Sequence, residues 1–137
     1  MTIESEVSEI IASLPWDVAQ SLRGKRVMVT GANGFMGQYL MGICRELAAW
    51  TIGLDVNGND RDVFTFDVST GLPQEKVDVI IHAAGIASPE GYRANPLGTL
   101  EVSHNGTRSA LELALKNAGC RVLTFSSSEV YSTPPAD

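Results

Sequence analysis

Residues 27–37 read VMVTGANGFMG, and this stretch decides the fold. An apolar, β-branched run meets a glycine-rich turn, and apolar residues at helical spacing follow. Gly31 permits a tight turn, Gly34 leaves room for a pyrophosphate at the backbone, and Gly37 lets the helix lie close to the strand. Because the free N–H groups at a helix start attract anions, the stretch predicts a strand–turn–helix unit that binds a dinucleotide.

The composition indicates a globular protein of ordinary polarity. The chain has 137 residues, 44% of them apolar, and a formal net charge of −6, which argues against a nucleic-acid surface. No segment reaches the ~18 apolar residues of a membrane span, and the acidic N-terminus does not resemble a signal peptide. Cys44 and Cys120 lack metal-ligand spacing. We therefore expect a cytoplasmic protein with two reduced thiols, no metal, and no nucleic-acid or membrane partner.

Residues 1–24 are predicted to form a helical appendage to a dinucleotide-binding domain over residues 25–137. Apolar residues from Ile3 to Leu14 lie at helical spacing, and Pro15 should end that helix. We expect Trp16, Val18 and Leu22 to anchor the segment on the domain. The appendage serves either packing or an oligomer contact.

The remaining pattern predicts an α/β protein, a Rossmann-type doubly wound parallel sheet truncated after the fifth strand. Strands are expected at 26–30, 50–54, 63–66, 77–81 and 121–125, with helices over 36–48 and 96–118 and a loop over 86–93. The connection 56–62 has no room for a crossover helix. Either it is a tight loop, or the third strand pairs differently from the usual order. Leucines cover much of the helix over 96–118, so part of this helix should face a partner.

Asp55 lies 18 residues after Gly37, close to the ~20 expected for the acid that binds an adenosine ribose. Its carboxylate would accept hydrogen bonds from the 2′-OH and repel a 2′-phosphate, so NAD is favoured over NADP. Arg61 is a counter-argument, although it lies in a loop. The alternative is that Asp55 only caps a turn.

Ligands of open parallel sheets bind at the carboxyl ends of the strands. Asp67 and Val68 would border the adenine there, and the small residues 83–85 would let a flat ring or ribose lie close to the backbone. His82 is interpreted as a structural histidine. The predicted cofactor contacts are Gly31, Asn33, Gly34, Phe35, Met36, Gly37, Asp55, Asp67, Val68, Ala83, Ala84 and Gly85.

Six short motifs together resemble the extended short-chain dehydrogenase/reductases, and more narrowly the NAD-dependent nucleotide-sugar epimerases, dehydratases and decarboxylases. They are TGANGFMG at 30–37, LD at 54–55, DV at 67–68, HAAG at 82–85, NGT at 105–107 and SSSEVY at 126–131. Residues 82–131 are most similar to UDP-glucuronate decarboxylases. The resemblance implies an enzyme of the lyase or isomerase type that uses NAD⁺ to oxidise C4 of a UDP- or dTDP-linked hexose transiently. It also implies a homodimer at full length.

The resemblance assigns catalytic roles to Ser127, Ser128 and Glu129, with the Ser127 hydroxyl bonded to the C4 oxygen. The other reading of residues 126–128 is a capping cluster at a strand end. The family's general base, a tyrosine in Tyr-x-x-x-Lys, is absent, because Pro135 stands four residues after Tyr131.

Two further positions differ from the family: Ser103 stands where many relatives carry Asn, and Gly98 where decarboxylases tend to carry Lys. The second difference weakens the case for an acidic sugar. We expect the NAD-binding N-terminal part of a longer enzyme, inactive alone, with the substrate-binding half missing. The alternative is a stand-alone, non-catalytic dinucleotide-binding or sensor module.

Overall fold

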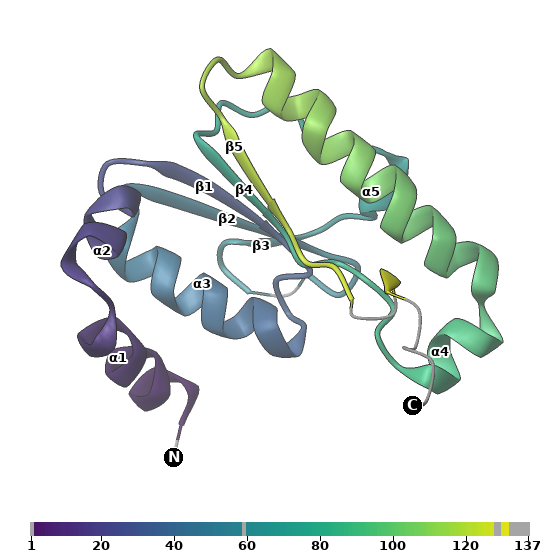
Figure 1. Ribbon diagram of the computed structural model, residues 1–137, viewed down its shortest axis with the longest axis horizontal. Helices are drawn as coiled ribbons and strands as arrows, with labels where there is room; N and C mark the ends of the chain where they lie inside the picture. The colour runs from purple at the N-terminus through teal and green to yellow at the C-terminus, as the bar shows by residue number, and fades with distance from the viewer. Residues whose placement is uncertain (1, 59, 128–129, 132–137) are drawn as a thin grey trace, which may run out of the picture.

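A computed structural model describes residues 2–58, 60–127 and 130–131. Five strands form one parallel sheet in the order β3-β2-β1-β4-β5 (Figure 1). They are β1 (Arg26–Thr30), β2 (Trp50–Asp55), β3 (Val63–Thr65), β4 (Val79–His82) and β5 (Arg121–Thr124). In the centre of the sheet, Val29 pairs with Gly53 on one side and Ile81 on the other. The predicted Rossmann-type sheet is confirmed.

The helices cover the two faces of the sheet. On one face lies α3 (Phe35–Leu47), and on the other lies α5 (Pro96–Lys116), as Figure 1 shows. The short turn η1 (Val68–Thr70) contacts α5 on the same face. Two buried clusters result. The cluster on the α5 side contains Met28, Ile52, Leu54, Val68, Leu72, Val77, Ile80, Ala110 and Leu113. The cluster on the α3 side contains Val27, Val29, Ala32, Met41, Cys44, Val63, Val79 and Ile81.

The chain order reverses between β1 and β4. Strands β2 and β3 lie on one side of β1, and β4 and β5 lie on the other. A sheet of this kind opens a crevice at the carboxyl ends of the strands beside the reversal. The fold therefore fixes where a ligand site should lie.

The connection between β2 and β3 is a tight loop, the first of the two predicted alternatives. Strand β3 pairs with β2 in parallel, with Leu54 opposite Phe64. Arg45 near the end of α3 holds the loop: its guanidinium bonds Asp60 at 2.7 Å, and its Nε bonds Asp62 at 2.9 Å. The hydrogen bond from Arg45 lowers the pKa of Asp62.

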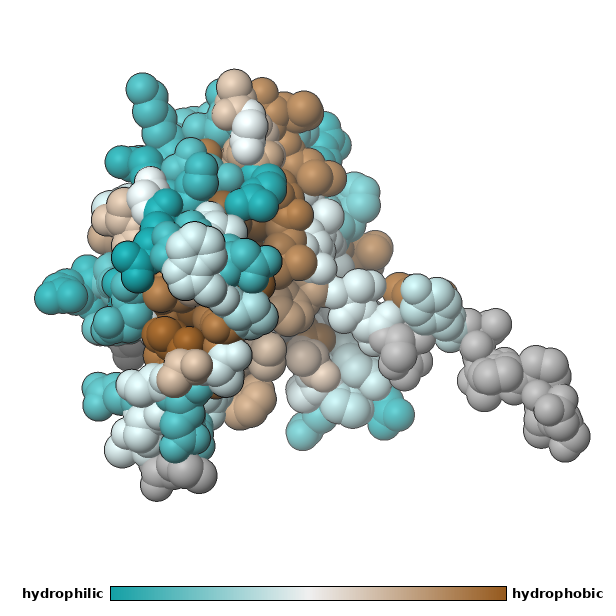
Figure 2. Space-filling model, turned by 60° about the vertical axis from the view of Figure 1, so that its left-hand side comes forward, coloured by the Kyte–Doolittle hydropathy of each residue, from teal (hydrophilic) through white to brown (hydrophobic). Residues whose placement is uncertain are grey.

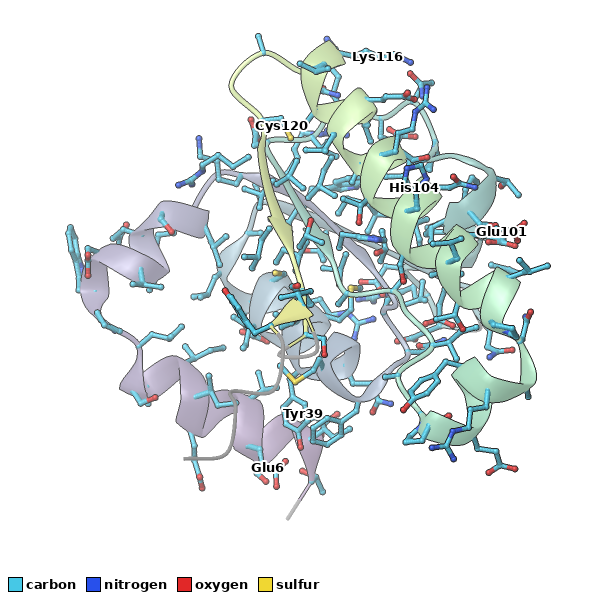
Figure 3. All side chains as sticks on the ribbon, turned by 45° about the vertical axis from the view of Figure 1, so that its right-hand side comes forward. Glu6, Tyr39, Glu101, His104, Lys116 and Cys120 are labelled. Carbon is cyan, nitrogen blue, oxygen red and sulfur yellow. The ribbon has the colours of Figure 1, made fainter. Side chains whose placement is uncertain are left out.

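Residues 3–22 form two helices, α1 (Ile3–Ser13) and α2 (Trp16–Leu22). The buried Val7 of α1 packs against Gly42 of α3, where a Cβ would come within 2.8 Å of the valine methyl. Tyr39 of α3 donates its hydroxyl to the carboxylate of Glu6, and Figure 3 shows the two side chains together. This hydrogen bond raises the pKa of Tyr39. The first helix thus packs on the helix that follows the glycine turn.

The predicted anchoring of the segment is wrong in part. Leu22 packs against the α3-side cluster as expected, but Trp16 is 76% exposed and Val18 is 43% exposed. A separate helix after Pro15 turns these two side chains toward solvent. The division into an appendage, residues 1–24, and a domain, residues 25–137, stays a prediction.

Several element ends differ from the sequence prediction by one or two residues, and two differences have a visible cause. Strand β4 begins at Val79 rather than at Val77, because the N–H of Val77 donates to the Asn117 side chain at 3.2 Å instead of joining the ladder. The predicted loop over 86–93 contains a short helix, α4 (Pro89–Ala94). The Ser88 hydroxyl caps it by accepting the N–H of Gly91 at 3.0 Å.

The surface retains apolar areas. Figure 2 shows a brown, apolar band between hydrophilic surfaces on the side that it turns forward. At the sheet edge, Val122 of β5 packs against the α5-side cluster, whereas Leu123 is 54% exposed. Alternate strand residues point to opposite faces, so the face of β5 opposite α5 is open. Within the described residues, no helix is long and apolar enough to cross a membrane.

Candidate functional site

A cavity of about 430 Å³ lies where the sequence predicts a ligand, beside the reversal of strand order. It is lined by the glycine turn, the ends of β2 and β4, the segment after β3 and the start of α5. The lining residues are Gly31, Gly34, Leu54, Asp55, Val56, Phe66, Asp67, Val68, Ser69, Ala83, Ala84, Gly85, Ile86, Asn95, Gly98, Glu101 and Val102. Eight of the twelve predicted cofactor contacts are among them.

The glycine turn has the geometry that its spacing predicts. Gly31 has φ +69°, and a Cβ there would lie 2.7 Å from the Ala83 carbonyl oxygen and 2.7 Å from the Ala84 nitrogen. A Cβ on Gly37 would lie 1.9 Å from the Gly31 oxygen. The first glycine therefore lets the turn pass close to the segment after β4, and the third lets α3 lie against the turn.

Gly34 begins α3 as its N-cap and carries no side chain to bond the first N–H groups of the helix. The first N–H groups of a helix have no intrahelical acceptor and carry a partial positive charge. Gly34 also lines the cavity. The helix start can therefore bind the phosphates of a ligand without a side chain in the way.

Asp55 ends β2 at the cavity, and its carboxylate is held by two backbone donors. The N–H of Asn33 donates to Oδ2 at 3.0 Å, and the N–H of Asn57 donates to Oδ1 at 3.0 Å. The structure thus contains the turn cap of the alternative reading. Because each ionised carboxylate has about four acceptor sites, the cap still leaves Asp55 able to bind a ribose.

Asp67 and Val68 form another wall of the cavity, with Phe66 beside them. The Asp67 carboxylate accepts the N–H of Ser69 at 2.9 Å and its hydroxyl at 2.7 Å, which starts η1. Val68 is buried and belongs to the α5-side cluster. This wall offers an apolar surface next to a carboxylate, which suits an adenine ring.

Residues 83–85 line the cavity after β4, and a buried pair behind them sets their position. The hydroxyl of Thr30 lies 2.7 Å from His82 Nδ1 and accepts the N–H of Ala84 at 3.3 Å. Burial lowers the pKa of His82, which is 3% exposed. On the far side of the ring, Gly106 of α5 leaves no room for a Cβ, which would lie 2.8 Å from His82 Cε1. The histidine has the structural environment that the sequence predicts.

Four predicted cofactor contacts do not line the cavity. Asn33 lies in the turn and contacts the β2–β3 loop, Phe35 is 78% exposed and Met36 is 46% exposed, and Gly37 is buried behind the turn. Phe35 packs edge-on against the ring of Tyr39. The side chains of Phe35 and Met36 do not line the cavity, so the predicted phosphate contact at these positions would have to come from their backbone N–H groups.

Of the three predicted catalytic residues, the structure describes only Ser127, which does not line the cavity. Ser127 is exposed, follows β5 by three residues, and accepts the N–H of Val130 at 3.2 Å through its carbonyl oxygen. Ser128 and Glu129 lie outside the described residues. Their roles stay predictions.

The start of α5 contributes lining residues that the sequence reasoning missed. Asn95 caps this helix by accepting the N–H of Gly98 at 3.0 Å, and Glu101 and Val102 follow one turn later. The Asn-Pro signal marked the helix start, but no local pattern shows that this start faces the cavity. Among the described residues, no group of three or more His, Cys, Asp or Glu could hold a metal ion.

The parallel sheet, the reversal of strand order and the glycine turn at the cavity define a dinucleotide-binding α/β protein of the Rossmann class. Residues 27–137 match the model of the NAD dependent epimerase/dehydratase family, and the chain belongs to this family. NAD is the cofactor of the family, which confirms the cofactor predicted from the sequence.

Named relatives cover most of this chain, but the chain covers little of them. It is 34% identical to UDP-glucuronic acid decarboxylase 1 of Danio rerio over 80% of its own length, and 34% identical to UDP-glucuronic acid decarboxylase 2 of Arabidopsis thaliana over 82%. The chain spans 29% and 28% of the lengths of these proteins.

Solved structures show the same fold. The epimerase Mth375 of Methanothermobacter thermautotrophicus superposes with a TM-score of 0.71 at 24% identity, over 88% of this chain and 42% of that one.

Proposed function

We propose that the cavity binds NAD, and that the chain is the NAD-binding N-terminal part of a nucleotide-sugar epimerase, dehydratase or decarboxylase. The observation that carries the proposal is the position of Asp55: its carboxylate borders the same cavity as Gly31 and Gly34. An acid for the ribose and a helix start for the phosphates thus meet in one site.

Different residues of the chain would contact different parts of the cofactor. The N–H groups at the start of α3 bind the pyrophosphate, and Asp55 accepts hydrogen bonds from the adenosine ribose. Asp67 and Val68 border the adenine, and the backbone of residues 83–85 supports the other ribose and the nicotinamide. When bound, NAD⁺ supplies the hydride acceptor for oxidation at C4 of the sugar. Ser127, Ser128 and Glu129 would contact the sugar.

The proposed substrate is a UDP- or dTDP-linked hexose. It is supported by the SSSEVY motif at 126–131 and by the relatives named UDP-glucuronic acid decarboxylase. The sequence contains no Tyr-x-x-x-Lys, so the base that would take the proton of the C4 hydroxyl is not among these 137 residues. We therefore expect no sugar turnover by the chain alone.

Calorimetry with NAD⁺ and NADP⁺ tests the cofactor role of Asp55. The chain should bind NAD⁺ more tightly, because a 2′-phosphate would meet the carboxylate. Asp55→Asn should remove most of that preference. Asp17→Asn makes the same charge change on the exposed surface of α2 and should preserve it. Equal affinity for the two dinucleotides, or no binding, would contradict the proposal.

A stand-alone, non-catalytic dinucleotide-binding or sensor module is the second candidate. The missing Tyr-x-x-x-Lys favours it, as does the position of Ser127 outside the cavity lining. The two candidates differ in how a longer form of the protein behaves. A parent enzyme that carries the motif converts a UDP- or dTDP-hexose, whereas a sensor binds NAD without sugar turnover at any length.

We also propose that α5 forms a homodimer contact with a second copy of the protein. Its outer surface exposes four leucines: Leu97 (73%), Leu100 (63%), Leu111 (50%) and Leu115 (87%). A two-fold axis at the level of residues 105–106 would place Leu100 opposite Leu111 of the second copy, so the apolar surface is self-complementary. Sedimentation velocity should show a concentration-dependent dimer. Leu100→Glu should dissociate it and Val18→Glu on α2 should not; a monomer at all concentrations refutes the contact.

A further inference from the structure

The loop between β2 and β3 is held in one shape by contacts from several elements. It spans residues 56–62 and joins two adjacent parallel strands without a helix. The Thr65 hydroxyl donates to the Gly58 carbonyl at 2.9 Å, and a Cβ on Gly58 would lie 2.2 Å from the backbone at Phe64. Arg45 binds Asp60 and Asp62 at the other end of the loop. The described residues of the loop thus contact β3 and are tied to α3.

Asn33 connects this loop to the glycine turn. Its side-chain amide donates to the Asn57 carbonyl oxygen at 2.6 Å, and its backbone N–H donates to Asp55 Oδ2 at 3.0 Å. The N–H of Asn57 donates to the other oxygen of Asp55, also at 3.0 Å. Three bonds thus join Asn33, Asp55 and Asn57 into a closed ring, which we call the Asn33 clamp.

The clamp orients the carboxylate of Asp55 from two sides. One donor comes from the glycine turn and the other from the loop, so neither oxygen can rotate away without breaking a bond. A carboxylate on a strand end without such bonds could rotate away from an incoming 2′-phosphate, which would weaken the repulsion between the two groups. A carboxylate that is fixed in advance cannot, and pre-organised groups discriminate more strongly between ligands.

We propose that Asn33 is a specificity-determining residue that acts through the clamp: its side chain fixes the Asp55 carboxylate and so enlarges the preference for a 2′-hydroxyl over a 2′-phosphate. The inference rests on the proposed binding of NAD. Asn33 is here a positioning residue, since its side chain does not line the cavity. Gln38 supports it from α3 by donating to the Asn33 carbonyl oxygen at 2.9 Å.

The test compares Asn33→Ala with Asn57→Ala in the 137-residue chain. The first removes the side-chain donor of the clamp. The second removes an exposed amide side chain of the same kind and keeps both backbone groups that the clamp uses, without a positive φ to strain alanine. Affinities for NAD⁺ and NADP⁺ are measured by calorimetry, and the readout is the ratio of the two affinities. A general loss of stability would weaken the binding of both dinucleotides alike and leave this ratio unchanged.

Asn33→Ala should lower the ratio of NAD⁺ to NADP⁺ affinity about five- to tenfold, the equivalent of one net hydrogen bond. Asn57→Ala should leave it within about twofold of the parent chain. Amide hydrogen exchange gives a second readout: the Asn57 N–H should exchange faster in Asn33→Ala, because the loop loses its tie to the turn.

Two failures are distinguishable. If the parent chain prefers NAD⁺ and Asn33→Ala keeps the full preference, or if Asn57→Ala lowers it equally, the role of Asn33 is refuted while NAD binding stands. If the parent chain binds neither dinucleotide, the proposed function is refuted, and the specificity role of Asn33 with it.

Discussion

Replacing Gly37 by alanine should displace the glycine turn from α3. A Cβ at this position would lie 1.9 Å from the Gly31 carbonyl oxygen and 2.7 Å from the Ala32 carbonyl carbon. Contacts below 3.0 Å do not occur for real Cβ atoms, so the helix and the turn must separate by at least about 1.1 Å. Both partners are backbone, and no side-chain rotation can relieve the contact.

The magnitude follows from two opposing effects. Inserting a methyl group into a packed site costs about 1–3 kcal/mol, and a backbone clash of this size belongs at the upper end. Alanine regains about 1 kcal/mol over glycine inside a helix. The free energy of unfolding should therefore fall by about 2 kcal/mol, which lowers Tm by roughly 8 °C for a chain of this length.

Gly42→Ala is the matched control, because Gly42 lies in the same helix and gains the same helix propensity. Its Cβ would meet the Val7 side chain at 2.8 Å, on the outer helix α1 and away from the turn. Thermal unfolding by circular dichroism and calorimetry with NAD⁺ measure both variants. Gly37→Ala should lose NAD⁺ affinity at least tenfold, whereas Gly42→Ala should keep it. A Gly37→Ala chain with the parent Tm and parent affinity would refute this reasoning.

Two further predictions concern titratable groups. Burial holds the pKa of His82 below its ordinary value of 6.5. Below about pH 6.5 the unfolded chain therefore binds more protons than the folded chain, and the free energy of unfolding should decrease as the pH falls. Chemical denaturation from pH 7.5 to 5.5 should show a smaller decrease for His82→Gln than for the parent chain. Burial raises the pKa of Cys44, which is 1% exposed, to about 11. A thiol reagent at pH 8 should therefore modify the partly exposed Cys120 of the native chain and reach Cys44 only after unfolding; equal rates for both thiols in the native chain would show that the α3-side cluster is open.

Local sequence patterns predicted the elements whose causes are local. Strand β1 has the predicted bounds, Arg26–Thr30, because an apolar run before a fixed glycine leaves little choice. The bounds of β4 could not be predicted in the same way. The group that removes Val77 from the ladder is the side chain of Asn117, 40 residues away. The spacing of residues in the sequence does not predict that contact.

The site was predictable where it depends on strand ends. Asp55, Asp67 and residues 83–85 follow strands, and parallel strands bring their carboxyl ends to one edge. The contribution of α5 was missed, because the route from β4 to Asn95 runs through a helix that the sequence did not reveal. The contacts of Asn33 were also beyond reach, since they depend on the path of the loop over 56–62.

The charges of the described cavity lining bear on how the proposed cofactor is held. Three acids, Asp55, Asp67 and Glu101, lie among its described lining residues, and that part of the lining contains no Lys or Arg. The pyrophosphate must then depend on the backbone N–H groups at the start of α3, whose partial charge is about half a proton charge.

Gly98 lines the cavity at a position where the resemblance to decarboxylases would predict a lysine. A Cβ at Gly98 would lie 2.2 Å from the Asn95 side-chain nitrogen, so a longer side chain there would require the capping side chain of Asn95 to shift. A sugar carboxylate would find no Lys or Arg in the described lining, and in the proposed binding mode Asp55 and Asp67 contact the adenosine end of NAD. Within the proposed function, this arrangement favours a neutral hexose over an acidic one.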